Sequence, residues 1–168
     1  PPRSTLFPYT TLFRSEAAAG NHLDPLRVAA VVDFVRTYAD RTHHGKEEDI
    51  LFAELDRRGL SDDDRRVMDE LTADHVYGRR LATELAEANE RYRLGDEDAH
   101  ATVVARLRAL RDFYPGHIET EDRVFFPAAR TYFTDEEDAE LLARFREFDR
   151  AMIHERYAAF VEEFEQWR

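Results

Sequence analysis

The sequence predicts an all-α fold, an up-down antiparallel bundle of four long helices. Apolar residues recur every three or four positions through most of the chain, as on the buried face of a helix. No stretch of useful length alternates with a period of two, so we predict no sheet. Only six glycines and six prolines interrupt the 168 residues, which leaves long segments free to be helical. Short loops between long helices favour antiparallel neighbours.

The four helices are expected near residues 24–58, 62–92, 100–131 and 135–167. Asp24, which precedes a proline, starts the first helix, and Ser61 caps the second. Pro115 lies inside the third helix and predicts a kink or a division of that helix. Thr134 and Glu137 have the capping-box spacing that starts the last helix.

Composition excludes several classes of protein. The chain carries 36 acidic and 24 basic side chains, a net charge of −12, whereas nucleic-acid binders usually have a basic surface. No apolar run approaches the roughly 20 residues that span a bilayer. There is no cysteine, which excludes disulfides and thiolate metal sites. We expect no nucleic-acid partner, no membrane partner and a cytoplasmic location.

The first residues of the chain do not read as part of a domain. Pro1 to Ser15, PPRSTLFPYTTLFRS, look like the in-frame translation of a sequencing adapter. Segments of this kind are excluded from reasoning about a fold. We therefore treat residues 1–15 as an artefactual tail and residues 16–168 as one domain, which suits a chain of this length.

Five ionisable residues fall on helical stripes that otherwise consist of Val, Leu, Ile and Met. They are His43, Glu47, His75, His117 and Glu121. A buried, unpaired charge is costly, so such groups pair with one another or bind a metal. A lone histidine on an apolar stripe is more often an ordinary core residue with satisfied hydrogen bonds. Five such residues on three helices indicate a common cause.

The first and third helices share a repeated motif. Positions 43–52 read HHGKEEDILF and positions 117–126 read HIETEDRVFF, so both contain His-x-x-x-Glu, a further acidic residue and a later Phe. Residues i and i+4 lie on one helix face, so each motif can present an imidazole and a carboxylate to one ion. This ligand set, without thiolate, suits iron, manganese or zinc, and paired carboxylates can bridge two ions.

The register of the helices brings these residues to one level of the bundle. Residues 45 and 75 are equidistant from residue 60, in the first turn, and residues 75 and 119 are equidistant from residue 97, in the second. Antiparallel helices joined by those turns place equidistant residues at the same height. We therefore expect the ionisable side chains of three helices to point into one cavity.

A second pair on the first helix competes with His43 and Glu47. His44 and Glu48 have the same i, i+4 spacing, but on an α-helix they point about 100° away from the first pair. The apolar stripe favours His43 with Glu47. His44 and Glu48 are then solvated, contact the ligands from outside, or become ligands if the register is shifted by one residue.

Three more residues are candidates for an extra ligand or for an outer contact to the site. Asp149 lies where the last helix reaches the level of the site, although a plain salt bridge explains it equally well. His154 lies about one turn beyond. Arg79, one turn after His75, can pair with a ligand carboxylate or with an anion, and surface arginines are abundant in this chain.

These motifs resemble a known family. The segments HHGKEEDILF, DHVYGR and YPGHIETEDRVFFP look like the hemerythrin-like (HHE cation-binding) family. The resemblance implies a four-helix bundle that holds a non-haem di-iron centre. It also implies that the ligands here are His43, Glu47, His75, His117 and Glu121. In that family a further helix precedes the one that starts at Asp24 and supplies at least one more histidine. Adapter-like residues occupy its place, so we expect the chain to lack that helix and its iron centre to be incomplete.

The resemblance also implies the function. The leading hypothesis is a di-iron protein that binds dioxygen or a related small ligand, or senses oxygen, iron or redox state. An alternative is a di-iron enzyme that acts on peroxide or nitric oxide. A further alternative is a metal-free helical interaction module, in which the five core residues would pair among themselves. The sequence names no protein partner.

Overall fold

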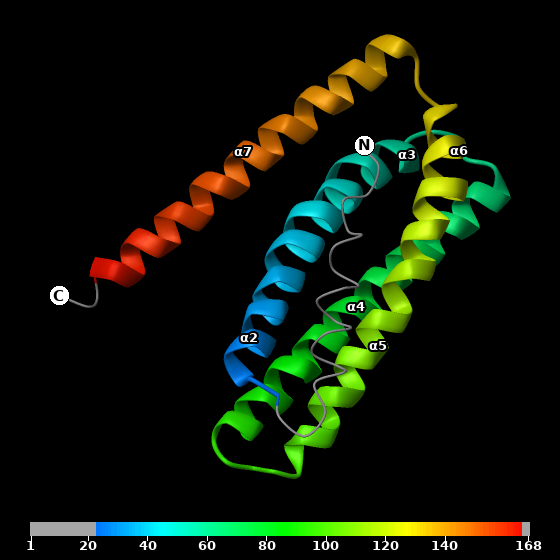
Figure 1. The fold of residues 1–168 in the computed structure, drawn as a ribbon. Helices are drawn as coiled ribbons and strands as arrows, with labels where there is room; N and C mark the ends of the chain where they lie inside the picture. The colour runs from blue at the N-terminus through cyan, green and yellow to red at the C-terminus, as the bar shows by residue number, and fades with distance from the viewer. Residues whose placement is uncertain (1–22, 166–168) are drawn as a thin grey trace.

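The computed structural model describes residues 23–165, with side chains as far as residue 153, and that part of the chain is a helical bundle without strands. The prediction of an all-α, up-down bundle of four helices is confirmed (Figure 1). The expectations for the tail at 1–15, for the missing first helix and for the side chain of His154 lie outside the described residues.

The four long helices begin and end within a few residues of the predicted bounds. The first consists of α2 (Pro25–Phe34), η1 (Val35–His44), η2 (Glu47–Phe52) and α3 (Ala53–Asp56), and the second is α4 (Asp62–Arg93). The third consists of α5 (Ala99–Thr120), η3 (Glu121–Phe125) and α6 (Phe126–Arg130), and the fourth is α7 (Asp135–Glu165). The η segments are π-helical, a winding that the sequence analysis did not predict.

The predicted caps are present. The Asp24 carboxylate accepts the backbone N–H two residues along, at 2.9 Å, and Ser61 Oγ accepts the N–H of Asp64 at 3.1 Å. Glu137 Oε2 accepts the Thr134 N–H at 2.8 Å, and Thr134 Oγ1 accepts the Glu137 N–H at 3.3 Å. Each cap satisfies backbone donors that have no partner inside their own helix, which defines where the helix starts.

Pro115 does not divide the third helix, and that part of the prediction is wrong. α5 runs without a break from Ala99 to Thr120, and its winding changes only at Glu121. Tyr114 and His117, on either side of the proline, are both buried. Their burial holds the helix continuous although the proline removes one backbone hydrogen bond.

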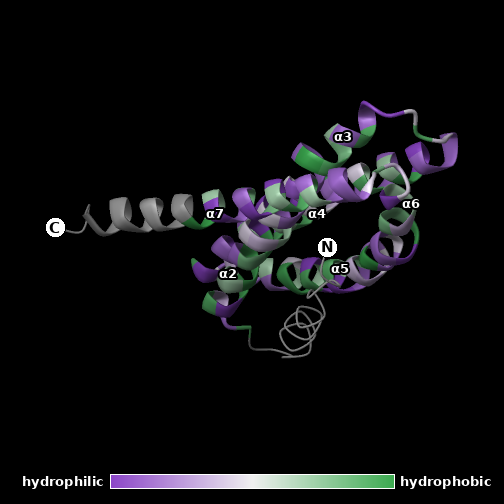
Figure 2. Cartoon of the chain, turned by 90° about the horizontal axis from the view of Figure 1, so that it is seen from above, coloured by the Kyte–Doolittle hydropathy of each residue, from purple (hydrophilic) through white to green (hydrophobic). Residues whose placement is uncertain are grey.

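Two apolar clusters occupy the two ends of the bundle. One gathers side chains of α2, α4 and α5 around Val28, Leu85 and Leu107, and the other gathers residues near Leu55 and Leu71. Hydrophobic and hydrophilic residues lie on different sides of the helices (Figure 2). Burying each Leu or Val contributes about 1.5–3 kcal/mol, so the clusters hold the helices in a defined register. On each of the first three helices, the ionisable residues lie between the two clusters along the chain.

The last helix, α7, packs against the first helix (Figure 1). Arg58 Nη2 and Glu137 Oε1 are 2.8 Å apart, and Lys46 Nζ and Asp149 Oδ1 are 2.7 Å apart. Leu141 adds an apolar anchor in the second cluster. In the described part of the chain, no helix is long and apolar enough to cross a membrane. The cytoplasmic location stays a prediction.

Candidate metal centre

Both repeated motifs contain a π-helical turn. The N–H of Gly45 bonds to the carbonyl of Asp40, and the N–H of Phe126 bonds to that of Glu121, each five residues back. A π-helical segment begins at the motif glutamate in both cases, at Glu47 and at Glu121. The wider turn places neighbouring residues less than the 100° apart that an α-helix gives, so both members of a His-His pair can reach one interior.

Six side chains from three helices form two groups of possible metal ligands. The groups are His44, His75 and His117, and His43, Glu47 and Glu121. Within each group, one ligand atom from each residue lies within 4.8 Å of the others. Five of the six residues are buried, and the side chain of His43 is 22% exposed. The structure therefore brings together the five residues predicted from the stripes and adds His44.

The two glutamates belong to the group of His43 but also face histidines of the other group. Glu47 has one oxygen 3.3 Å from His43 Nε2 and the other 3.4 Å from His75 Nε2. Glu121 Oε1 is 2.9 Å from His117 Nε2, and its Oε2 is 3.8 Å from His43 Nε2. Glu121 Oε1 is also 3.9 Å from His75 Nε2. Each carboxylate thus faces histidines of both groups, as a carboxylate shared between two metal positions would.

The ligand atoms of this cluster lack hydrogen bonds of good geometry. The atoms concerned include Nε2 of His43, His44, His75 and His117 and all four carboxylate oxygens of Glu47 and Glu121. Buried polar side-chain atoms nearly always have a hydrogen-bond partner, so a set of unpartnered atoms at one point needs an explanation. Nitrogen and oxygen atoms that converge on one place without hydrogen bonds between them fit a cation, and imidazole with carboxylate is a ligand set that iron accepts. The residues present therefore fit a metal centre.

The charges of the metal-free cluster favour the same interpretation. Burial lowers the pKa of His44 to about 4, an effect that the neighbouring imidazoles increase. Burial also opposes the charged form of His75, but Glu121 and Glu47 outweigh it and raise the pKa of His75 to about 9. Although burial raises the pKa of Glu121, three histidines hold it well below its usual range. The ionised Glu121 thus has a proton on His75 as counter-charge, and a bound cation would replace that proton.

The outer nitrogen of each buried histidine faces a carboxylate. The three pairs are His75 Nδ1 with Glu48 Oε1 at 2.7 Å, His117 Nδ1 with Asp74 Oδ2 at 3.2 Å and His44 Nδ1 with Asp40 Oδ1 at 3.5 Å. The first two contacts assign the Nδ1 protons of His75 and His117 to the outside of the cluster and turn their Nε2 atoms to the inside, whereas His44 Nδ1 has no hydrogen bond of good geometry. Such outer carboxylates orient histidine ligands and raise their basicity.

The structure places the other candidates outside the cluster. Glu48 contacts His75, and Arg79 contacts both Glu48 and Asp40 at 2.7 and 2.6 Å. Asp149 is not brought to the cluster, because its carboxylate pairs with Lys46 near the surface.

Asp40 and Asp74 were not among the predicted residues. Asp40 lies four residues before His44, a spacing that could have indicated the contact. Asp74 precedes His75 in sequence but contacts His117 on another helix. No sequence pattern predicts that contact, because it depends on how the two helices pack.

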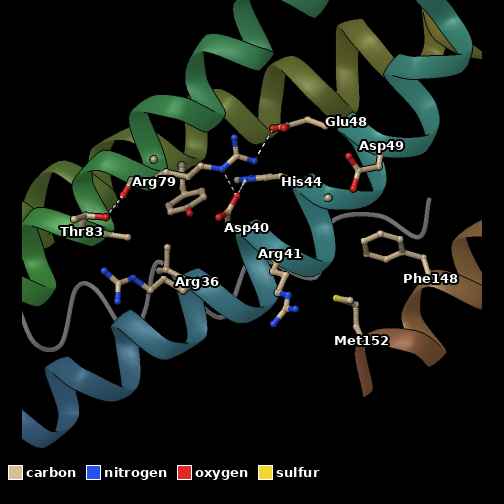
Figure 3. A pocket seen from close by; sticks show the side chains of 15 residues that line it. Arg36, Asp40, Arg41, His44, Glu48, Asp49, Arg79, Thr83, Phe148 and Met152 are labelled. Carbon is tan, nitrogen blue, oxygen red and sulfur yellow. Dashed lines mark hydrogen bonds and ion pairs between the residues drawn. The ribbon is translucent and has the colours of Figure 1, made fainter. Parts of the chain in front are cut away.

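A pocket of about 860 Å³ lies beside the cluster and is partly open to solvent. Its walls come from η1, η2, α4, α5 and α7, and they include His44, Asp40, Glu48 and Arg79 (Figure 3). Gly78, one turn after His75, lines the same pocket and leaves its wall without a side chain. The pocket thus reaches the three-histidine group on the His44 side.

A helical bundle with a buried histidine–carboxylate cluster defines a class, that of bundles that can hold a metal ion between their helices. Comparison with known families identifies the family within this class. The hemerythrin HHE cation binding domain matches residues 10–129 and 69–167, two overlapping segments. The chain therefore belongs to the hemerythrin HHE cation-binding family, and the resemblance inferred from its motifs is confirmed. No curated protein and no solved structure gives a match.

Proposed function

We propose that this protein is a non-haem di-iron protein that binds dioxygen or a related small ligand, or that senses oxygen, iron or redox state through its centre. The observation that carries the proposal is the set of buried imidazole and carboxylate atoms that converge without hydrogen bonds. Membership of a cation-binding family supports the same class of function.

Each group of three side chains would hold one ion. His44, His75 and His117 form the nitrogen-rich position, and His43 with the two glutamates forms the oxygen-rich position. Glu47 and Glu121 belong to the second group but also face histidines of the first, so their carboxylates would be shared between the two positions. Six side chains do not fill two six-coordinate irons, so positions stay open for water or a small ligand. Bound iron would supply redox chemistry and a coordination position for that ligand.

The residues of the chain contribute orientation, dryness and proton control. Glu48 and Asp74 hold the Nδ1 protons of His75 and His117 and so aim their Nε2 atoms inward, and Asp40 lies 3.5 Å from His44 Nδ1. The apolar clusters at either end of the bundle limit access of water to the cluster from along its axis. The proton on His75 leaves when a cation enters, so loading releases protons and is favoured at higher pH.

An enzyme that acts on peroxide or nitric oxide is the second candidate. The pocket beside His44 would give such a substrate an approach from solvent to the cluster. Both candidates require an open position on iron. Turnover of peroxide or nitric oxide by the iron-loaded protein would separate them. A metal-free interaction module has less support, because its core residues would pair with good geometry.

The test is anaerobic loading with Fe(II), a count of bound iron, and visible spectra before and after air is admitted. The five predicted ligands implied an incomplete centre, but His44 adds a sixth side chain and completes two groups of three, so the proposal expects two irons per chain and a new absorption band after air. The double variant Glu47→Gln, Glu121→Gln should lose both. Glu119→Gln, an exposed glutamate of the same motif, is the matched control and should behave as the unaltered protein. Equal loading of all three proteins would overturn the proposal, because the iron would then be bound elsewhere.

A further inference from the structure

Arg79 lies in the pocket wall between two carboxylates. Its Nε donates to Asp40 Oδ1 at 2.6 Å and its Nη2 donates to Glu48 Oε1 at 2.7 Å. These two acids lie about two turns apart on the first helix, whereas Arg79 comes from α4 (Figure 3). The guanidinium therefore ties two helices together at the level of the cluster through charged hydrogen bonds, which are the strong kind.

Each of the two carboxylates also faces a histidine. Glu48 Oε1 is 2.7 Å from His75 Nδ1, and Asp40 Oδ1 is 3.5 Å from His44 Nδ1. The two imidazoles stack on one another, with ring centroids 3.9 Å apart. One guanidinium is thus connected to the outer nitrogens of two neighbouring rings, through Glu48 by hydrogen bonds and through Asp40 by a longer contact in which His44 Nδ1 has no hydrogen bond of good geometry. The relay through Glu48 is the tighter one.

A guanidinium suits this position better than any other side chain. Asp40 and Glu48 are both acidic and lie beside a cluster that already contains two glutamates, so repulsion between like charges would favour moving each of them toward solvent if Arg79 were absent. Arg79 offers donors in a fixed planar fork, and its two contacts set the direction of both carboxylates at once. An ammonium group is a point charge on a flexible stem and cannot fix two directions in this way.

We propose that Arg79 is a positioning residue for the stacked pair: it holds Glu48 and Asp40 against the Nδ1 sides of His75 and His44 and so aims both Nε2 atoms into the cluster. The consequence for metal affinity rests on the proposed function, whereas the orientation of the rings does not.

The third histidine provides an internal comparison. His117 Nδ1 faces Asp74, and the contacts of Arg79 among the described residues are with Asp40 and Glu48. Loss of the guanidinium should therefore release His75 first and His44 second. His117 should keep its contact.

The experiment compares Arg79→Gln and Arg79→Lys with the control Arg80→Gln. Arg80 is the next residue on the same helix, is largely exposed and pairs with Glu84, so its variant removes the same charge without touching the relays. Two quantities are measured. NMR spectra of the imidazole N–H groups in the metal-free protein report whether the His75 and His117 Nδ1 protons are held. Competition with a chelator under anaerobic conditions gives the affinity for Fe(II).

Arg79→Gln should lose the His75 Nδ1–H signal to solvent exchange, keep that of His117 and bind Fe(II) about 10–100-fold more weakly, as is usual when an outer contact to a ligand is removed. Arg79→Lys should fall between this variant and the unaltered protein. Arg80→Gln should match the unaltered protein in both measurements.

Several results would overturn the inference. One is an Arg79→Gln protein that keeps both the His75 signal and the Fe(II) affinity. Another is an equal effect of Arg80→Gln, which would assign the change to net charge. Loss of the His117 signal in both Arg79 variants would show a general loss of structure. If the unaltered protein binds no Fe(II), the proposed function fails, and the His75 signal alone decides the role of Arg79.

Discussion

His44 and His75 stack face to face, with ring centroids 3.9 Å apart and ring planes 8° apart. Two imidazolium rings would repel each other at this distance, so the stable arrangement has one neutral ring and one protonated ring. The neighbours of the two rings establish that difference. Burial and the other imidazoles lower the pKa of His44 to about 4, whereas the glutamates beside His75 overcome its burial and raise its pKa to about 9.

The raised pKa of His75 predicts that the metal-free protein loses stability in mild alkali. A folded-state pKa of about 9 against an unfolded value of 6.5 means that the stabilisation is complete below pH 6.5 and is lost as the pH rises through 9. The loss should be on the order of 3 kcal/mol. Urea unfolding of the metal-free protein across this range measures it. A His75→Gln protein should lack this dependence, and an unchanged dependence in that variant would contradict the assignment.

His44 predicts the opposite slope in mild acid. Its folded-state pKa lies below its unfolded value of 6.5, so the ring contributes stability above pH 6.5 that is lost as the pH falls through about 4. Urea unfolding between these values should show less loss in His44→Gln than in the unaltered protein. Equal losses in the two proteins would show that other groups cause the acid slope.

The two ligand groups predict separable metal positions. His44→Ala removes a ligand from the nitrogen-rich group and His43→Ala removes one from the oxygen-rich group, so each should lower the iron count from two per chain to about one. Glu47→Ala should lower the affinity at both positions, because its carboxylate lies between them. Iron counts after anaerobic loading and gel filtration measure these losses. His100→Ala, near the opposite end of α5, is the control and should keep two irons.

The apolar cluster around Leu55 and Leu71 predicts that a cavity made there strongly lowers the free energy of unfolding. Leu71 is fully buried one turn before His75, and Leu71→Ala should lower the free energy of unfolding by about 2–5 kcal/mol. Leu94 is 73% exposed, and Leu94→Ala should change the free energy of unfolding by less than about 0.5 kcal/mol. Urea unfolding of the metal-free proteins measures both. Similar effects of the two substitutions would contradict the described packing.

The start of α7 predicts an acid-sensitive anchor. The Arg58 guanidinium and the Thr134 N–H lower the pKa of Glu137 from 4.5 to about 2. The contact therefore stabilises the folded protein above pH 4.5, and this stabilisation is lost as the pH falls through about 2. NMR titration of the Glu137 carboxyl should give this low value. In Arg58→Gln the value should move toward 4.5, and a carboxyl that titrates normally in the unaltered protein would show that the anchor is absent.

Much of the bundle could be predicted from the sequence because it depends on local rules. The stripe spacing, the caps at Asp24, Ser61 and Thr134, and the short turns determine four helices and their order. The same turns also determine the height of His75 relative to the two motifs, because antiparallel helices of known register have no other alignment. For this reason the structure brings the five predicted residues to one place, while their role as ligands stays a proposal.

The remaining features depend on backbone winding and on tertiary packing. In an α-helix, neighbouring residues point about 100° apart, which would direct His44 away from His43. The π-helical turns instead bring both side chains to the cluster. Asp74 holds a histidine of a different helix, which spacing along one helix cannot indicate. Asp149 was expected near the site only because of its level in the bundle, whereas its carboxylate forms an ion pair with Lys46 on the first helix.

The most direct test of the central claim is a crystal structure of the iron-loaded protein with anomalous scattering recorded at the iron edge. The account predicts two anomalous peaks inside the bundle, about 3.5–4 Å apart, with Glu47 and Glu121 between them. One peak should lie against His44, His75 and His117, and the other against His43. Iron bound only at the protein surface, or a cluster that stays empty at saturating iron, would contradict the account.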